Sequence, residues 1–433
     1  MKKSRLALAC TLLSIGLAGC SDSDNKSTAS LRVLHASADA PAVDVAIDGK
    51  VELSDVSFQQ GSGYLTVPAG TRKLALLVDG VEVLTQSVDL AKNGSYSVIA
   101  SNDVAELEFK VLDDTEFRNN DVADVTVVHS ATVVEGVDIN VTAPGAELPQ
   151  MPTLAGVPFG ADATLEEVTA GDYRVRIAPA DTSTIAYDSG TLPISGDVTV
   201  VAVNSTKGAS SVSLVAWSDA ETPVATVLDN SAEVRVVHAV DSVDVDVFAG
   251  GELLEADFNY TETIGYLKVV AGSLDVAVAP AGQGVGNAIP SLSGNLDLER
   301  GESYTLIAAG NPSEQALITL TDVREPLDSS QAYVRLVHAS PAPAANPVDI
   351  YVVAAGDPVT GDPLLNDVAF TQDSGYLAVP GATYDVVIAA DGTNVPAVPG
   401  TAGLELTAGS ITTALAIGAD VSSLAPLLLD DKR

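Results

Sequence analysis

Apolar and polar positions alternate with a period of two along much of the chain. In residues 31–35 this period places Val33 and His35 on one face of a strand and Arg32 and Leu34 on the other. Similar β-rich runs, each ended by turn residues, recur downstream as TRKLALLVDG, YRVRIAP and YDVVIAADG. After the leader, no stretch of the sequence has a long apolar pattern with the 3.6-residue period of a helix. The pattern therefore predicts an all-β protein.

The strand pattern repeats four times. Each copy has one histidine at the end of an apolar run, and the four histidines of the chain are His35, His129, His238 and His338. The next landmark follows each histidine in the same order, as SGYLTVPAG, ATLEEVTAG, IGYLKVVAG and SGYLAVPG. A period of about one hundred residues is typical of domains rather than of solenoid repeats. Roughly seven short strands in each repeat favour an immunoglobulin-like or transthyretin-like β-sandwich.

The chain is thus expected to contain a lipoprotein signal peptide followed by four tandem sandwiches. Polar, turn-rich stretches near 114–124, 229–233 and 324–333 are the expected joints between them. The expected segments are 1–19 for the signal peptide, 20–30 for a polar tether, 31–113 for repeat one, 125–228 for repeat two, 233–323 for repeat three and 333–431 for repeat four.

The first residues resemble a bacterial lipoprotein signal. Basic residues precede an apolar stretch over residues 6–17, which is short for a membrane span, and the sequence LAGC then ends at Cys20. We expect Cys20 to carry acyl chains that anchor the protein in the membrane. Ser21, in place of an aspartate, favours the outer membrane, on its surface or its periplasmic face. An ordinary secretory signal with an incidental cysteine is the alternative interpretation.

The charge of the chain excludes one class of partner. The net charge is −37, and loss of the three basic residues in the leader makes it −40. Binding to nucleic acid requires basic side chains for the phosphates, so we exclude it. The acidity attracts divalent cations in general, but no calcium loop of the Asp-x-Asp-x-Asp-Gly type is present. We therefore expect no cofactor, and at most weak calcium binding. With Cys10 lost in the leader, Cys20 is the remaining cysteine, so no disulfide is expected.

The first repeat resembles a known bacterial family. The stretch RVLHASADAPAVDVAIDG is similar to the opening of the family called domain of unknown function 4397, and SGYLTVPAG is similar to its next segment. His338, Ser340 and Asp349 fit the same pattern in repeat four, whereas repeat three fits less well and repeat two least. The resemblance implies an exported protein with tandem domains. It implies no catalytic residues.

Each histidine is followed by a loop of variable length and then by an aspartate at the start of the next strand. The pairs are His35 and Asp44, His129 and Asp138, His238 and Asp244, and His338 and Asp349. We favour a structural clasp, in which the imidazole ties the end of the first strand to the loop before the aspartate strand. A metal site is the second interpretation, but one histidine and one aspartate in each repeat are few ligands for zinc.

A hydrolase is the third interpretation. Ser37 and Ser340 lie two residues after their histidines, on the same face of an extended strand. Val240 replaces the serine in repeat three, and no Gly-x-Ser-x-Gly sequence presents a nucleophile. We therefore expect a non-enzymatic, lipid-anchored envelope protein with a structural, adhesin-like or matrix-binding role, whose partner is an envelope or surface protein or a polysaccharide. The alternative is a periplasmic or surface ligand-binding protein, with or without calcium dependence.

Overall fold

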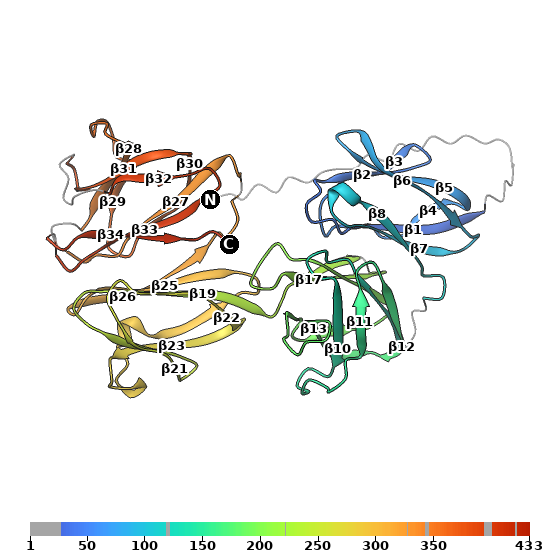
Figure 1. The fold of residues 1–433 in the computed structure, drawn as a ribbon, viewed down its shortest axis with the longest axis horizontal. Helices are drawn as coiled ribbons and strands as arrows, with labels where there is room; N and C mark the ends of the chain where they lie inside the picture. The colour runs from blue at the N-terminus through green and yellow to red at the C-terminus, as the bar shows by residue number, and fades with distance from the viewer. Residues whose placement is uncertain are drawn as a thin grey trace, which may run out of the picture.

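The computed structural model describes residues 27–117, 122–220, 222–326, 328–342, 346–393, 401–420 and 422–433. These residues form eight β-sheets of four or five strands, arranged as four β-sandwiches that we number 1 to 4 in chain order (Figure 1). The prediction of an all-β chain with four tandem sandwiches is confirmed. No helix within the described residues is long and apolar enough to cross a membrane. Cys20 and the leader lie outside the described residues.

Sandwiches 1 and 2 occupy the first half of the chain. Sandwich 1 contains β1 (Thr28–His35), β2 (Val43–Ile47), β3 (Lys50–Val56), β4 (Leu65–Pro68), β5 (Gly70–Val78), β6 (Val81–Leu90), β7 (Ser95–Ser101), the short 3-10 turn η1 (Val104–Glu106) and β8 (Glu108–Asp113). Sandwich 2 contains β9 (Val122–His129), β10 (Gly136–Thr142), β11 (Leu154–Pro158), β12 (Asp162–Thr169), β13 (Gly171–Pro179), β14 (Tyr187–Asp188), β15 (Leu192–Ile194), β16 (Val198–Asn204), β17 (Val212–Ser218) and β18 (Val224–Val227).

Sandwiches 3 and 4 occupy the second half. Sandwich 3 contains β19 (Ser231–Val240), β20 (Val245–Ala249), β21 (Glu252–Phe258), β22 (Thr263–Val270), β23 (Gly272–Pro280), η2 (Val285–Asn287), η3 (Pro290–Leu292), β24 (Gly294–Leu298), β25 (Ser303–Asn311) and β26 (Glu314–Asp322). Sandwich 4 contains β27 (Gln331–His338), β28 (Val348–Ala354), β29 (Leu365–Val368), β30 (Asp373–Pro380), β31 (Ala382–Ala390), β32 (Thr401–Leu406), β33 (Ile411–Ile417) and β34 (Ala425–Asp430).

One topology recurs in all four sandwiches. The sheet that contains the histidine strand has the order β4-β1-β7-β8 in sandwich 1, β12-β9-β16-β17-β18 in sandwich 2, β22-β19-β25-β26 in sandwich 3 and β30-β27-β33-β34 in sandwich 4. In each of these sheets the histidine strand runs parallel to its later neighbour, as β1 does to β7. We call this sheet the histidine sheet. The histidine strands are therefore central, with a neighbour on each side.

Each sandwich has its own apolar core between its two sheets. In sandwich 1, Leu31 and Val33 from the histidine sheet pack against Leu74 and Leu76 from the opposite sheet, and all four are at most 1% exposed. Corresponding clusters of Val, Leu and Ile fill the other three sandwiches. Burial of this apolar surface supplies the main favourable free energy of folding.

The outer faces of the histidine sheets are also apolar, and they pack against each other in pairs. Leu34 and Ile99 of sandwich 1 form one cluster with Val201 and Trp217 of sandwich 2. A second cluster joins sandwich 3 to sandwich 4, with Val237, Ile307 and Leu320 on one side and Val337, Leu415 and Leu429 on the other. We call these units the first pair and the second pair. Because both faces of the histidine sheet are covered, polar alternation is lost there, and every residue of β19 is buried.

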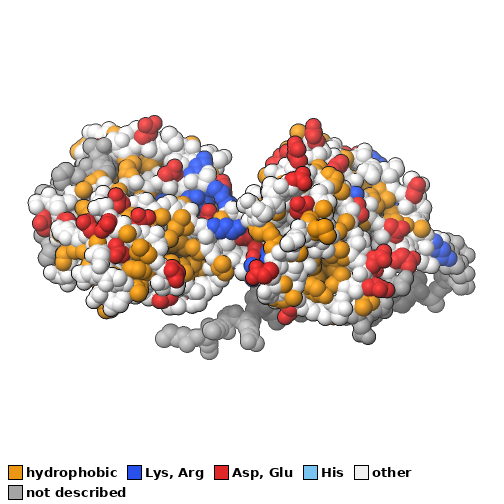
Figure 2. Space-filling model, turned by 60° about the horizontal axis from the view of Figure 1, so that its bottom comes forward, with side chains coloured by type: hydrophobic (Ala, Val, Ile, Leu, Met, Phe, Trp, Pro, Cys, Tyr) orange, Lys and Arg blue, Asp and Glu red, His pale blue; other side chains and the backbone are white. Residues whose placement is uncertain are grey.

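The two pairs are joined through sandwiches 2 and 3, where few residues separate β18 from β19. Asp229, 4% exposed, lies in this joint and accepts the backbone N–H of Asp188 at 2.7 Å and the Nζ of Lys268 at 3.0 Å. Arg300 donates to the carbonyl of Ser189 at 2.7 Å. Figure 2 shows Lys and Arg side chains gathered where the two lobes meet, whereas acidic side chains are spread over both. The scarce basic residues thus reinforce the joint.

The cluster between sandwiches 1 and 2 predicts a fluorescence change on disruption. Ile99→Asp would place a charge in an interface where Ile99 is 0% exposed, a change that costs several kcal/mol. Trp217 is the single tryptophan of the chain and is itself 0% exposed there. We expect Ile99→Asp to shift its emission to longer wavelength. Val83→Asp, at a position 46% exposed, is the matched control and should leave the emission unchanged. Unchanged emission in both variants would contradict the pairing.

Candidate functional site

Three of the histidine rings bridge a strand end and the loop that follows it. The Nε2 atoms lie 3.1, 2.9 and 2.6 Å from loop carbonyl oxygens, for His35 to Pro41, His129 to Val134 and His238 to Val243 respectively. The Nδ1 atoms accept the backbone N–H two residues further on, from Ser37, Ala131 and Val240. These contacts assign the ring proton to Nε2, and they use both nitrogens. His338 has the corresponding place in β27 and is 1% exposed.

The backbone of each histidine is held by the loop that precedes the fourth strand of its sandwich. The N–H of His35 donates to the carbonyl of Gln60 at 2.9 Å, and its carbonyl accepts the N–H of Gln59 at 2.8 Å. The same two bonds recur in the other sandwiches, where Gly160, Thr261 and Thr371 replace Gln59. All four of these residues have φ between 64° and 77°. A constrained loop therefore surrounds each histidine.

Burial decides the ionisation of these rings. It lowers the pKa of His35, His129 and His238, and the hydrogen bond to the loop carbonyl opposes this shift only in part. The neutral imidazole is therefore the form that the fold accommodates at neutral pH.

The described contacts of Asp44, Asp138 and Asp349 are with backbone N–H groups, and they hold a bulge in the neighbouring strand. Asp44 accepts the N–H of Asp55 at 2.9 Å, and Asp138 accepts that of Gly156 at 2.7 Å. Asp349 accepts the N–H of Asp367 at 3.1 Å. The donor residue has a positive φ in each case, at a shift in strand register. These carboxylates thus stabilise a backbone irregularity rather than forming a catalytic pair.

In sandwich 3 the equivalent aspartate is Asp246, and the sequence-based assignment of Asp244 is corrected. Asp246 lies in β20 and accepts the N–H groups of Asp257, with φ 51°, and of Gly282. Asp244 precedes that strand. The sequence VDVDV presents two aspartates two positions apart, and a shift of two residues keeps the same face of a strand. Periodicity alone therefore could not separate them.

The serines considered as nucleophiles do not direct their hydroxyls to the histidines. The Oγ of Ser37 donates to Asp39 at 3.2 Å, and that of Ser340 donates to the carbonyl of Gly418 at 2.6 Å. It is the backbone N–H of Ser37, and not its hydroxyl, that meets His35. Within the described part of the chain, no group of three or more His, Cys, Asp or Glu side chains is placed to hold a metal ion.

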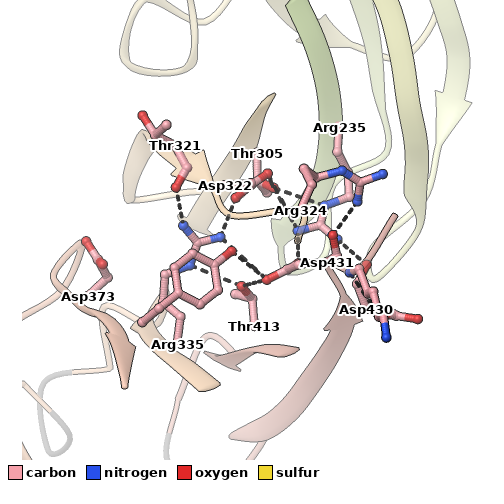
Figure 3. A network of polar contacts seen from close by, with 12 residues as sticks. Arg235, Thr305, Thr321, Asp322, Arg324, Arg335, Asp373, Thr413, Asp430 and Asp431 are labelled. Carbon is pink, nitrogen blue, oxygen red and sulfur yellow. Dashed lines mark hydrogen bonds and ion pairs between the residues drawn. The ribbon is translucent and has the colours of Figure 1, made fainter. Parts of the chain in front are cut away.

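A second polar site lies between sandwiches 3 and 4, and it was not predicted. Arg235 of sandwich 3 pairs with Asp431 of sandwich 4, while Arg335 of sandwich 4 pairs with Asp322 of sandwich 3 (Figure 3). All four side chains are at most 4% exposed. Each arginine also donates to a backbone carbonyl of the other sandwich, as Arg335 does to Thr321 at 2.9 Å. The two halves of this arrangement are related by an approximate two-fold symmetry.

Hydroxyl groups of threonine and tyrosine donate further hydrogen bonds to Asp322 and Asp431. The same threonines accept from the arginines. The Nε of Arg235 donates to Thr305 at 3.0 Å, and that of Arg335 donates to Thr413 at 3.0 Å. The phenol groups of Tyr266 and Tyr376 donate to Asp322 and Asp431 at 2.8 and 2.7 Å. Each tyrosine ring also lies beneath an arginine, with guanidinium-to-centroid distances of 4.7 and 4.5 Å. Burial beside these carboxylates raises the pKa of both tyrosines, so both remain protonated donors.

The first pair has only half of this arrangement. Arg32 donates to Ser97 at 2.6 Å and to Thr199 at 3.0 Å, and its guanidinium lies 4.2 Å from the centroid of Trp217. At the position that corresponds to Arg32, sandwich 2 has Thr126, which bonds Thr164 at 3.0 Å. One arginine and one tryptophan thus replace the two arginines of the second pair.

A sequence signal for this network exists. The arginines stand three residues before His35, His238 and His338, on the face of the strand opposite to the histidine. A basic residue repeated at an otherwise apolar strand face is unusual, and acidic residues recur at the end of the last strand of the same repeats. The second repeat, with Thr126, breaks the pattern.

The histidine contacts predict a stability loss that follows the pairing. His35→Ala removes a partner from two buried hydrogen bonds, which costs about 1–3 kcal/mol for each group left unsatisfied. We expect a lower free energy of unfolding for the first pair and little change in the second. His338→Ala is the matched variant and should act on the second pair instead. Calorimetry is the measurement, since pairs that unfold independently give two separate transitions. A loss shared equally by both would contradict independent clasps.

The lowered histidine pKa also sets a pH dependence. Below about pH 6.5 the unfolded chain binds protons that the buried rings do not, so stability is complete above that pH and falls as the pH decreases. The His35→Ala variant lacks one of the imidazole rings that bind these protons in the unfolded chain. The stability difference between wild type and His35→Ala should therefore shrink as the pH is lowered from about 7 to about 5. Denaturant titrations at each pH measure it, and a constant difference would refute the neutral clasp.

A match to a protein family agrees with the repeat structure. A family described as Domain of unknown function (DUF4397) matches residues 29–140, 232–351 and 342–433, well over half of the chain. No curated protein matches the chain. Among solved structures, the Bacillus anthracis TIE protein is aligned over 87% of this chain and 66% of its own, with 10% identity and a TM-score of 0.15. The chain therefore belongs to the DUF4397 family, and it carries tandem copies of that domain.

Proposed function

We propose that the protein is a lipid-anchored, non-enzymatic component of the bacterial cell envelope, with a structural role in adhesion or matrix binding. The observation that supports this proposal most directly is how the polar side chains are used. The described contacts of the buried histidines, arginines and aspartates are made within and between sandwiches. Such contacts serve to fix the position of loops and of sheets.

The bonded joint between sandwiches 2 and 3 and the two pairs support a role in display. A paired unit keeps its loop ends at fixed places, because the histidine rings fix the loops and the arginine network fixes the sheets. Surface loops on a rigid scaffold are where binding residues usually lie. A tether such as residues 20–30 separates that scaffold from the anchor that we propose at Cys20.

The anchor can be tested together with the role. Cys20→Ser removes the proposed acylation site, so the protein should move from the membrane fraction to the soluble fraction. If display on the envelope is the function, cells with Cys20→Ser should lose surface attachment as fully as cells that lack the gene. Ser21→Ala is the matched control and should keep both properties. Attachment that survives release of the protein would contradict a display role, and unchanged membrane association would refute the anchor.

A further inference from the structure

Sandwiches 3 and 4 present faces of the same construction to each other. Val237 pairs with Ile307 in the histidine sheet of sandwich 3, and Val337 pairs with Leu415 at the equivalent position of sandwich 4. All four side chains are at most 2% exposed, and all belong to the apolar cluster between the two sandwiches. The apolar parts of the two faces are therefore nearly interchangeable.

The charged groups at the centre of these faces follow the same plan. Each face has an arginine on its histidine strand and an aspartate at the end of its last strand, and 3.9 Å separates the two charged groups in Arg235 with Asp322 and in Arg335 with Asp431. Across the interface, each arginine pairs with the aspartate of the other face. Such an exchange about a two-fold axis is the pattern of an isologous interface, in which one surface is complementary to a copy of itself. The face of sandwich 4 thus has the groups needed to pair with a second face of sandwich 4.

One contact at the rim distinguishes the two faces. The Oε2 of Glu233 lies 3.7 Å from the Nε of Arg324 and 3.8 Å from a terminal nitrogen of Arg433, so it holds sandwich 3 to sandwich 4. The equivalent position of sandwich 4 is Tyr333, which has no carboxylate. The short linker between β26 and β27 also keeps the two faces at a high effective concentration. The closed pair is therefore the favoured form of a single chain, and a second copy competes when the pair opens.

We propose that sandwich 4, once released from sandwich 3, binds sandwich 4 of a second copy of this chain through the same face. Arg335 of each copy would pair with Asp431 of the other, and the apolar side chains around them would be covered as they are in the closed pair. Sandwich 3 stays attached to sandwich 2 through the contacts of Asp229 and Arg300, so sandwich 4 is the one that moves away. Opening of the second pair thus becomes a way to link two copies. This inference is independent of the envelope role proposed above.

The double variant Ile307→Asp with Leu320→Asp opens the pair from one side. It places two carboxylates in the apolar face of sandwich 3 and leaves sandwich 4 and the core of sandwich 3 unchanged. All chains are full length and carry Cys20→Ser, so that the mass is measured without an anchor. Sedimentation velocity should show wild type as a compact monomer. The double variant should form a dimer of twice that mass in the micromolar range, and this dimer should dissociate on dilution.

Further substitutions in the double variant test which face forms the dimer. Leu415→Asp spoils the face of sandwich 4 and should give an extended monomer, whereas Leu364→Asp, at a position 49% exposed, is the matched control and should keep the dimer. Asp431→Arg would set an arginine against Arg335 of the other copy and should also give a monomer. Adding Arg335→Asp to that chain restores opposite charges and should restore the dimer.

Circular dichroism checks the folding of every variant, and the emission of Trp217 checks that the first pair stays intact. Three results would overturn the proposal: a double variant that is monomeric at every concentration, a dimer that survives Leu415→Asp, or a dimer that is indifferent to the charges at positions 335 and 431. The last two would show unspecific association of exposed apolar surface.

Discussion

The reciprocal exchange of charge between sandwiches 3 and 4 is the interaction on which the arrangement of the second pair depends. Each arginine finds its closest aspartate in the other sandwich, so neither sandwich can satisfy its own buried charge as well alone. The apolar cluster around the network supplies non-directional attraction. The ion pairs are directional, and leaving one partner of a buried pair uncompensated costs about 3–5 kcal/mol. We infer that the apolar faces bring the sheets together and that the charges fix their register.

In the first pair, the equivalent interface contains a different set of buried polar contacts. Arg32 keeps an aspartate of its own sandwich, Asp114, at 3.6 Å, and burial raises the pKa of that carboxyl. Across the interface it meets the ring of Trp217, whose Nε1 donates to the carbonyl of Ser62 at 2.9 Å. A stacked guanidinium and an indole that bonds the partner backbone thus take the place of a second ion pair. The two faces of the first pair therefore differ in chemistry, with an arginine on sandwich 1 and a tryptophan on sandwich 2.

The sequence predicts the fold well because the fold is built from local signals. Period-two alternation, turn residues and a fourfold repeat predict the sandwiches without tertiary information. The histidine was expected to tie a strand end to the following loop, and the contacts of His35, His129 and His238 with loop carbonyls have that geometry. The aspartate was assigned wrongly in repeat three because periodicity cannot distinguish Asp244 from Asp246.

The arginine network could not be predicted in this way, because it depends on which sandwich faces which. The period of two places Arg32 on the outer face of its strand, but that face is solvent-exposed in an isolated sandwich and buried in a pair. Nothing local to Arg235 or Asp431 shows that residues almost two hundred positions apart will meet.

The back-to-back pairing determines how far the protein extends. Four sandwiches joined end to end would form a long rod, but here the chain doubles back twice, so the molecule spans two sandwiches in length and two in width (Figure 1). The molecule is accordingly shorter than a straight rod of the same four sandwiches. Under tension applied between the two ends of the chain, separation of one pair would lengthen the molecule while every core stayed folded. The pairs would then act as extensible couplings, and the strength of the arginine network would set the force at which the second one opens.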